Sequence, residues 1–213
     1  MTTTLLAAPA WWDLATAAGR FTLCPVKPDR DLALVHRWMN DPAVARCWGL
    51  AGSAERTAEH LAQQRALPHT DAYLARLSGR PIGYWELYRA AEDRLGAHYP
   101  ARPEDLGIRL LIGDPGLRGL GLGALLLTAL CDAVQEQSPC RIVAAFDEGD
   151  SAAVRAFIAA GFVTSGTVLS GTVLSGIFAP GIAPVIPAPH SGKRATLVIR
   201  DPAGRPDHGG SRL

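Results

Sequence analysis

Residues 105–134 read DLGIRLLIGDPGLRGLGLGALLLTALCDAV, and the order of the patterns in this stretch is informative. An apolar strand pattern at 108–112 passes through a turn at 114–116 into RGLGLG, and a long apolar helix pattern follows directly. Glycine leaves backbone N–H groups unhindered, and the start of a helix directs those groups and its dipole to one place. The stretch therefore predicts a cradle for a phosphate group between a strand and a helix.

Two other phosphate-binding loops do not fit this pattern. The glycines alternate at Gly119, Gly121 and Gly123, so they do not form a GxGxxG dinucleotide fingerprint, and no acidic ribose partner follows on a second strand. The stretch also lacks the GK[ST] that a P-loop requires. A glycine-rich turn that opens an ordinary core helix is the other alternative, and only the surrounding sequence separates it from a ligand loop.

Length and composition indicate one domain. The chain has 213 residues, of which 48% are hydrophobic, and this is enough for one well-buried core. A formal net charge of +1 gives no broad attraction to nucleic acid or to an anionic membrane, so neither is expected as a partner. Residues 1–20 lack a basic start and a long apolar run, which argues against a signal peptide or membrane span. Four cysteines without CxxC spacing indicate reduced packing residues and a cytoplasmic location.

The periodic patterns predict an α/β fold in which a mixed central sheet is flanked by helices. We expect the domain to cover residues 20–200, after an N-terminal extension at 1–19 and before a disordered tail at 201–213. Expected strands cover 21–26, 72–77, 82–88, 105–113, 141–146 and 194–200. Expected helices cover 29–40, 42–48, 53–66, 120–137 and 150–160.

Residues 163–192 read as a repeat- and proline-rich insertion. SGTVLSGTVLSG at 165–176 holds two copies of a five-residue unit, and an odd period puts equivalent valines on opposite faces of a strand. Prolines 180, 184, 187 and 189 exclude a central strand for the second half. We expect a lengthened hairpin or a loosely ordered surface loop, with a substrate flap or a partner contact as alternatives.

The context of the glycine loop resembles a known superfamily. RxxGxG after a strand, then a helix, a strand and a helix that ends in AAGF at 159–162, resembles the GNAT acyl-CoA-dependent acyltransferases. HRWMNDPAVARCW at 36–48, PIGYWELYRAAEDRLGAHY at 81–99 and the motif at 105–123 resemble the siderophore-biosynthesis branch, which includes mycobactin-type lysine N-acyltransferases and aerobactin-type hydroxylysine acetyltransferases. The resemblance covers about residues 20–162 and the strand KRATLVIR, and it implies a single-domain GNAT fold. WMNDPxV carries a weaker similarity to aminoglycoside N-acetyltransferases.

The resemblance implies acyl-CoA as the co-substrate and no metal. The strand at 108–112 would pair with the pantetheine arm of the donor, and its backbone around Leu111 would polarise the thioester carbonyl. RGLGLG would hold the pyrophosphate, with a charge-assisted contact from Arg118 whose alternative is an exposed surface arginine. The residues predicted to bind the co-substrate are Leu111, Ile112, Arg118, Gly119, Leu120, Gly121 and Gly123.

Two carboxylates are the catalytic candidates. Glu86 lies between two tyrosines on one face of a strand, which suits a cationic or hydroxylamine acceptor, although a solvated polar face is the alternative. Asp147 follows a strand at the position where related enzymes carry a catalytic aspartate, although a helix cap or turn is its alternative, with Asp150 competing for the cap. The residues predicted to bind the acceptor are His36, Trp48, Tyr84, Trp85, Tyr88 and Arg109.

Two positions depart from the branch. GIRLLIG has Arg109 where the branch commonly has a histidine proposed to take part in catalysis, and a guanidinium cannot act as a general base. We expect Arg109 either to bind a carboxylate of the acceptor or acyl chain, or to turn towards Asp105 or Asp147. Phe157 stands where many GNAT enzymes have a tyrosine that protonates the departing thiolate. For His36, packing on its helix is the alternative to a place in the substrate cavity.

These residues predict an acyl-CoA-dependent N-acyltransferase that acts on the side-chain amine or hydroxylamine of a lysine- or ornithine-like siderophore precursor. Direct transfer in a ternary complex needs no covalent enzyme intermediate. Acetylation of an aminoglycoside or other small amine is the first alternative. A catalytically silent acyl-CoA-binding domain is the second, and an acyl carrier protein is an alternative source of the acyl group.

Overall fold

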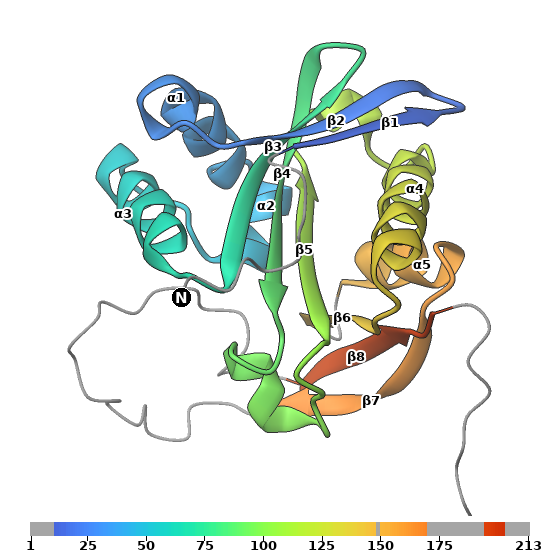
Figure 1. Ribbon diagram of the computed structural model, residues 1–213. Helices are drawn as coiled ribbons and strands as arrows, with labels where there is room; N and C mark the ends of the chain where they lie inside the picture. Colours follow the sequence, from blue (N-terminus) through green and yellow to red (C-terminus); the bar gives the residue numbers. More distant parts are fainter. Residues whose placement is uncertain (1–10, 148–149, 170–193, 203–213) are drawn as a thin grey trace, which may run out of the picture.

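The computed structural model describes residues 11–147, 150–169 and 194–202. Their strands form one eight-stranded mixed sheet in the order β1-β2-β3-β4-β5-β6-β8-β7 (Figure 1). All neighbours are antiparallel except β5 and β6, which the helix α4 connects as a crossover. The strands are β1 (Trp12–Thr16), β2 (Gly19–Pro25), β3 (Thr70–Leu77), β4 (Arg80–Arg89), β5 (Leu106–Ile112), β6 (Ile142–Asp147), β7 (Val163–Leu169) and β8 (Arg194–Arg200).

Helices cover both faces of the sheet (Figure 1), which confirms the predicted mixed α/β domain. One face packs against α4 and α5 in a core that includes Trp85 and Phe21, whose ring centroids are 5.3 Å apart. The other face packs against α1, α2 and α3. The helices are α1 (Pro28–Met39), α2 (Pro42–Trp48), α3 (Ala54–Ala66), α4 (Leu122–Gln137) and α5 (Ser151–Ala159), with short 3₁₀ helices η1 (Arg94–His98) and η2 (Pro115–Leu117).

The sheet divides between β5 and β6. β4 follows β5 along its whole length, from Arg89 opposite Leu106 to Gly83 opposite Ile112. β6 pairs with β5 only at Leu106–Ile142 and Gly107–Val143 and with β8 along its full length. The upper part of β5 therefore has no paired neighbour on its β6 side within the described part of the chain.

The edges of the domain differ from the prediction. β1 lies inside the expected extension 1–19, yet it pairs with β2 and buries Trp12, so the sheet begins before residue 20. The expected insertion 163–192 begins with β7, which pairs with β8 and has a register shift between Thr164 and Gly166. The rest of the predicted surface loop, at 170–192, and the predicted tail from residue 203 onwards lie outside the described residues.

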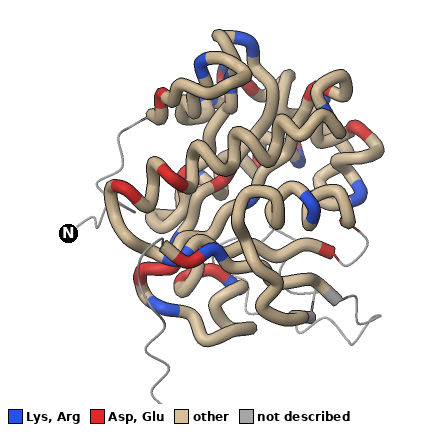
Figure 2. Tube along the Cα trace, turned by 90° about the vertical axis from the view of Figure 1, so that its right-hand side faces the viewer, with Lys and Arg blue, Asp and Glu red and all other residues tan. Residues whose placement is uncertain are grey.

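Charged residues of both signs are interspersed along the described trace, as Figure 2 shows for one side of the molecule. This distribution agrees with the formal net charge of +1. None of the helices in residues 11–147, 150–169 and 194–202 is both long enough and apolar enough to cross a membrane.

Candidate functional site

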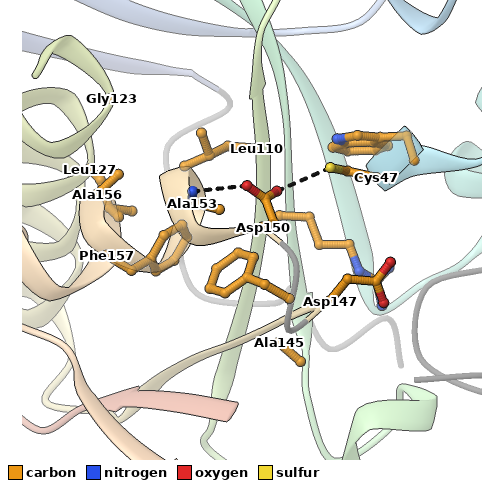
Figure 3. Close-up of a pocket in the computed structure, with 13 residues that line it drawn as sticks. Cys47, Leu110, Gly123, Leu127, Ala145, Asp147, Asp150, Ala153, Ala156 and Phe157 are labelled. Carbon is orange, nitrogen blue, oxygen red and sulfur yellow. Dashed lines mark hydrogen bonds between the residues drawn. The ribbon is translucent and has the colours of Figure 1, made fainter. Parts of the chain in front are cut away.

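A cleft lies where β5 and β6 separate. Its walls come from α2, β5, α4, β6 and α5, and its space, including the open mouth, is about 700 Å³. Figure 3 shows Asp150 and Cys47 directed towards one another, with Leu127, Ala156 and Phe157 on the side of α4 and α5. The cleft joins the start of α4 to the end of β6, because Gly123 and Asp147 both line it. Elements far apart in sequence therefore form one continuous site.

The hydrogen bonds at the two ends of β5 show to which side its backbone N–H and C=O groups point. The Leu106 N–H donates to the Arg141 carbonyl on the β6 side at 2.9 Å, whereas the Gly113 N–H donates to Ile82 of β4 at 2.7 Å. Backbone groups alternate along a strand, so even-numbered residues of β5 face β6 and odd-numbered residues face β4. Beyond Gly107, the even-numbered backbone groups thus face the opening.

This alternation changes the predicted place of the thioester contact. Leu111 directs its backbone groups towards β4, and its side chain is buried. Leu110 and Ile112 instead direct theirs towards the opening, and the Ile112 carbonyl accepts from Arg118 Nε at 2.8 Å. The backbone N–H groups positioned to meet a ligand in the cleft are therefore those of Leu110 and Ile112, one residue on either side of the predicted centre.

The glycine loop has the backbone conformation that the phosphate prediction requires. Gly119 and Gly121 have φ of 75° and 77°, a region that side chains disfavour, and Gly121 is the N-cap of α4. A Cβ at Gly119, Gly121 or Gly123 would meet no protein atom within 4 Å, so the space in front of the loop is open. α4 has no side-chain cap, which leaves its first N–H groups available to an anion. Leu120 is 72% exposed beside them.

Arg118 has other partners than the predicted phosphate. Its Nε and Nη2 donate to the carbonyls of Ile112 and Gly113, and Nη1 donates to Asp41 at 2.9 Å. Asp41 is also the N-cap of α2 and accepts from the Ala43 N–H. Arg118 therefore fastens the loop to β5 and α2, and anion binding at this loop depends on the backbone of α4.

Asp147 and Asp150 have separate tasks at the start of α5. Asp150 caps the helix by accepting from the Ala153 N–H at 3.1 Å, and its other oxygen accepts from the Cys47 thiol at 3.1 Å (Figure 3). Burial and, after it, the hydrogen bond to Asp150 raise the pKa of the Cys47 thiol to about 11. Because Asp150 holds the cap, the half-buried carboxylate of Asp147 lines the cleft without that structural task.

Glu86 is buried behind the wall of the cleft. Its Oε1 accepts from His60 Nε2 at 3.0 Å and from the Tyr84 hydroxyl at 2.8 Å, and its Oε2 lies 3.5 Å from Arg109 Nη1. Burial opposes ionisation most strongly, but the hydrogen bond from His60, the nearby charges and the Tyr84 hydroxyl together lower the pKa of Glu86. Glu86 is therefore an ionised partner of Arg109 and does not itself line the cleft, contrary to its predicted catalytic place.

Arg109 connects this buried group to the cleft, which it lines. Its guanidinium donates to Asp93 at 3.1 Å and lies 4.4 Å from the centroid of the Tyr88 ring. Of the two predicted partners, Asp105 is bound instead by Arg141 and the Tyr99 hydroxyl. The Asp93 and Glu86 carboxylates thus offset the charge that would have drawn an anionic substrate group.

The remaining acceptor-binding candidates are dispersed. Trp48 lines the cleft and packs edge-on against the buried Tyr84, with centroids 5.5 Å apart. His36 is half-buried on α1, with its Nδ1 3.2 Å from Thr57 Oγ1, and it does not line this cleft. Trp85 was wrongly placed, because alternation along β4 turns it into the core of the opposite face.

Sequence reasoning missed Cys47, His60 and Asp93 as members of the site. Cys47 stands in the 36–48 motif but was assigned to packing, and the strand pattern around Glu86 carries no sign of a histidine 26 residues earlier. No group of three or more His, Cys, Asp or Glu side chains in the described residues is arranged to hold a metal ion.

Comparison with known families gives a match over most of the chain. Residues 27–169 match the family described as "Acetyltransferase (GNAT) domain". This range includes the glycine loop, both walls of the cleft and the strand that carries Glu86.

Curated relatives and solved structures give further similarity. Lysine N-acyltransferase MbtK from Mycobacterium sp. (strain MCS) is 33% identical over 60% of this chain and 53% of its own length. N(6)-hydroxylysine O-acetyltransferase from Escherichia coli is 39% identical over 43% of this chain and 29% of its own. The chain thus spans about half the length, or less, of these relatives. A crystal structure of the aminoglycoside acetyltransferase AAC(6')-Ib with coenzyme A superposes with a TM-score of 0.64 at 23% identity, over 85% of this chain and 94% of the other, and shares the fold.

Proposed function

This chain belongs to the family of GNAT acetyltransferase domains, and on that premise we propose that it is an acyl-CoA-dependent N-acyltransferase. The acceptor is the side-chain amine or hydroxylamine of a lysine- or ornithine-like siderophore precursor. The acyl group moves directly from the thioester to the acceptor nitrogen while both substrates are bound.

The opening between β5 and β6 is the observation that carries this proposal. A glycine loop and the uncapped start of α4 lie at one end of it, and the Asp147 carboxylate lies at the other. An acyl-CoA has the same order of groups, since its phosphates and thioester are separated by the extended pantetheine arm. The unpaired side of β5 gives that arm a strand edge to pair with, as an extended peptide pairs with an exposed sheet edge.

The donor is held and polarised by backbone groups. Anion binding at the start of α4 requires no arginine, because N–H groups and the helix dipole converge there. The N–H of Leu110 or Ile112 donates to the thioester carbonyl, where negative charge grows as the nitrogen attacks. A fixed backbone donor stabilises that charge without reorganising.

The transfer itself forms one bond and breaks one. The neutral acceptor nitrogen attacks the carbonyl carbon, the C–N bond forms, the C–S bond breaks, and the thiolate leaves with the bonding electron pair. Asp147 lies in the cleft where it can orient the nitrogen and accept its proton. Phe157 packs between Phe146 and Phe162 and has no acidic proton, so the thiolate is protonated from solvent or by the proton that the nitrogen released.

The acceptor class rests on the relatives and on the charges of the cleft. MbtK is named as a lysine N-acyltransferase, and the E. coli relative is named as an N(6)-hydroxylysine O-acetyltransferase. The Asp147 and Asp150 carboxylates line the cleft of this chain, and Arg109 is already paired. A cationic or neutral nitrogen acceptor suits these surroundings better than an anionic nucleophile does.

A matrix of donors and acceptors tests the proposal. Acetyl-CoA, a longer acyl-CoA, succinyl-CoA and an acyl carrier protein are each combined with hydroxylysine, hydroxyornithine, lysine and kanamycin, and free thiol release and product mass are measured. We expect the fastest turnover with the hydroxylamines, whose nitrogen is largely uncharged at neutral pH. Turnover of kanamycin alone would favour aminoglycoside acetylation, and donor binding without turnover of any acceptor would indicate a silent domain.

A further inference from the structure

A buried polar cluster lies behind the cleft wall, and the reaction described above does not use all of it. It consists of His60 on α3 with Glu86 and Tyr84 on β4, and we call it the Glu86 cluster. The His60 and Glu86 side chains are 3% and 1% exposed. A buried carboxylate and imidazole are costly to retain unless their partners are well placed, so the cluster calls for an explanation.

The hydrogen bonds assign the proton on His60. An ionised carboxylate can only accept, so His60 Nε2 carries a hydrogen and donates it to Glu86 Oε1. His60 Nδ1 is buried without a hydrogen-bond partner. His60 Nε2 is therefore the donor and the Glu86 carboxylate the acceptor in this bond.

The Glu86 cluster is connected to the cleft through Arg109. Glu86 and Arg109 are directly opposite one another in the register of β4 and β5, and Oε2 lies 3.5 Å from Nη1. On its other side the guanidinium is held by Asp93 and by the face of Tyr88. The Arg109 side chain thus lies between Glu86 on one side and Asp93 and Tyr88 on the other, and it lines the cleft.

We propose that His60 is a positioning residue for acyl transfer: by donating to Glu86 it keeps that carboxylate aimed at Arg109, which holds the guanidinium in place on the cleft wall. The inference rests on the proposed function, because it assigns a role within the same site. His60 touches neither substrate, and its effect passes from α3 through β4 to β5.

The effect of His60 on Glu86 and Arg109 depends on pH. The groups that face Glu86 are His60 from α3, Tyr84 from β4 and Arg109 from β5, and Asp93 lies beyond Arg109. Among the influences that favour its ionised form, the His60 hydrogen bond ranks first, and burial opposes them all. Without that donor, burial favours the protonated form of Glu86, and Arg109 loses the charge of one carboxylate partner as the pH falls.

The test compares His60→Leu, which removes the donor, with His60→Gln, whose side-chain amide can donate from nearly the same place as Nε2. His69→Leu is the matched control, because the half-buried His69 lies 3.7 Å from the exposed Glu92 carboxylate and does not line the cleft. The kcat and KM for one acyl-CoA and its best acceptor are measured from about pH 5.5 to 9, the range over which a histidine or a perturbed carboxylate titrates.

We expect the acid limb of kcat/KM to move towards neutral pH in His60→Leu, with a loss of about tenfold at the acid end, equal to 1.36 kcal/mol, beyond any loss at alkaline pH. His60→Gln and His69→Leu should keep the wild-type profile. Acyl-CoA affinity should be unchanged in all variants, because the anion site is on α4. The acceptor's own ionisation appears equally in every profile and cancels in the comparison.

Other outcomes overturn the inference. A loss of the same factor at every pH in His60→Leu would show a structural role only, and a folded His60→Gln that is no better than His60→Leu would refute the donor role. If His60→Leu does not fold, the ¹⁵N spectrum of the wild-type imidazole decides, and a hydrogen on Nδ1 with a bare Nε2 contradicts the proposal. If the wild type turns over no substrate, the proposed function fails, while a ¹³C titration of the Glu86 carboxyl still reports whether His60 keeps it ionised.

Discussion

Gly121→Ala should abolish most of the donor affinity at a modest cost in stability. Gly121 has φ of 77°, and a methyl group there would meet no protein atom within 4 Å. The free energy of unfolding should therefore fall only by the cost of placing a non-glycine residue in the left-handed conformation, about 1–2 kcal/mol. In a chain of this size each kcal/mol lowers Tm by about 2–4 °C. The methyl group would instead occupy the open space in front of α4, where the pyrophosphate is proposed to bind.

The effect on binding follows from that geometry. A phosphate held away from the first N–H groups of α4 loses charge-assisted hydrogen bonds, each worth about 1.5–3 kcal/mol. One such loss weakens binding about tenfold to a hundredfold. Isothermal titration with acetyl-CoA measures this change, and thermal unfolding measures the stability of the same sample.

Gly79→Ala separates backbone strain from blocked binding. Gly79 has φ of 82° in the β3–β4 turn, and a Cβ there would also meet no atom within 4 Å. Both variants should lose similar stability, and only Gly121→Ala should lose affinity. Equal affinity of two folded variants for acetyl-CoA would refute the phosphate cradle.

Three further changes test the other parts of the site. Asp147→Asn should lower kcat by about 10²–10⁴-fold with little change in donor affinity, if its carboxylate accepts the proton in the rate-limiting step, as a pH series of kcat will show. Cys47 should react slowly with iodoacetamide at neutral pH and faster as the pH approaches its pKa of about 11. Asp150→Asn, which still caps a helix well, should lower that pKa and speed the reaction at pH 8 to 9. Arg109→Gln should lower the free energy of unfolding by about 3 kcal/mol, because it removes the guanidinium beside the buried Glu86 carboxylate, and Glu86→Gln in the same chain should recover part of it in chemical denaturation.

Local pattern was sufficient for the elements that form the site. The alternation along β4 correctly put Glu86 with Tyr84 and Tyr88 and turned Trp85 to the other face. Trp85 was nevertheless proposed to bind the acceptor, against the alternation itself. The glycine loop also has the open, positive-φ backbone that its sequence predicts, but α4 starts at Leu122, because the left-handed Gly121 cannot belong to the helix.

Contacts between distant parts of the chain could not be predicted in this way. Arg118 lies 77 residues from Asp41 in the sequence. A guanidinium can pair with a phosphate or with a carboxylate, and only the position of the loop beside α2 shows that Arg118 pairs with Asp41. Asp93, which pairs with Arg109, lies 16 residues before it in the connection that follows β4, and no local pattern links the two. The separation of β5 from β6 likewise depends on where β6 pairs with β5 and with β8. Neither strand's own sequence predicts these pairings.

The motif at 36–48 shows what such contacts contribute to the site. Its similarity to the acyltransferases suggested side chains that touch the acceptor, and Trp48 does line the cleft. The helix it forms, α2, also joins the two ends of the cleft: Asp41 binds Arg118 beside the glycine loop, and Cys47 binds Asp150 at the start of α5. Asp41 caps one end of this helix and the left-handed Gly49 ends the other, which fixes its length. The spacing between the donor loop and the Asp147 side of the cleft is therefore set partly by one short helix from the N-terminal half of the chain.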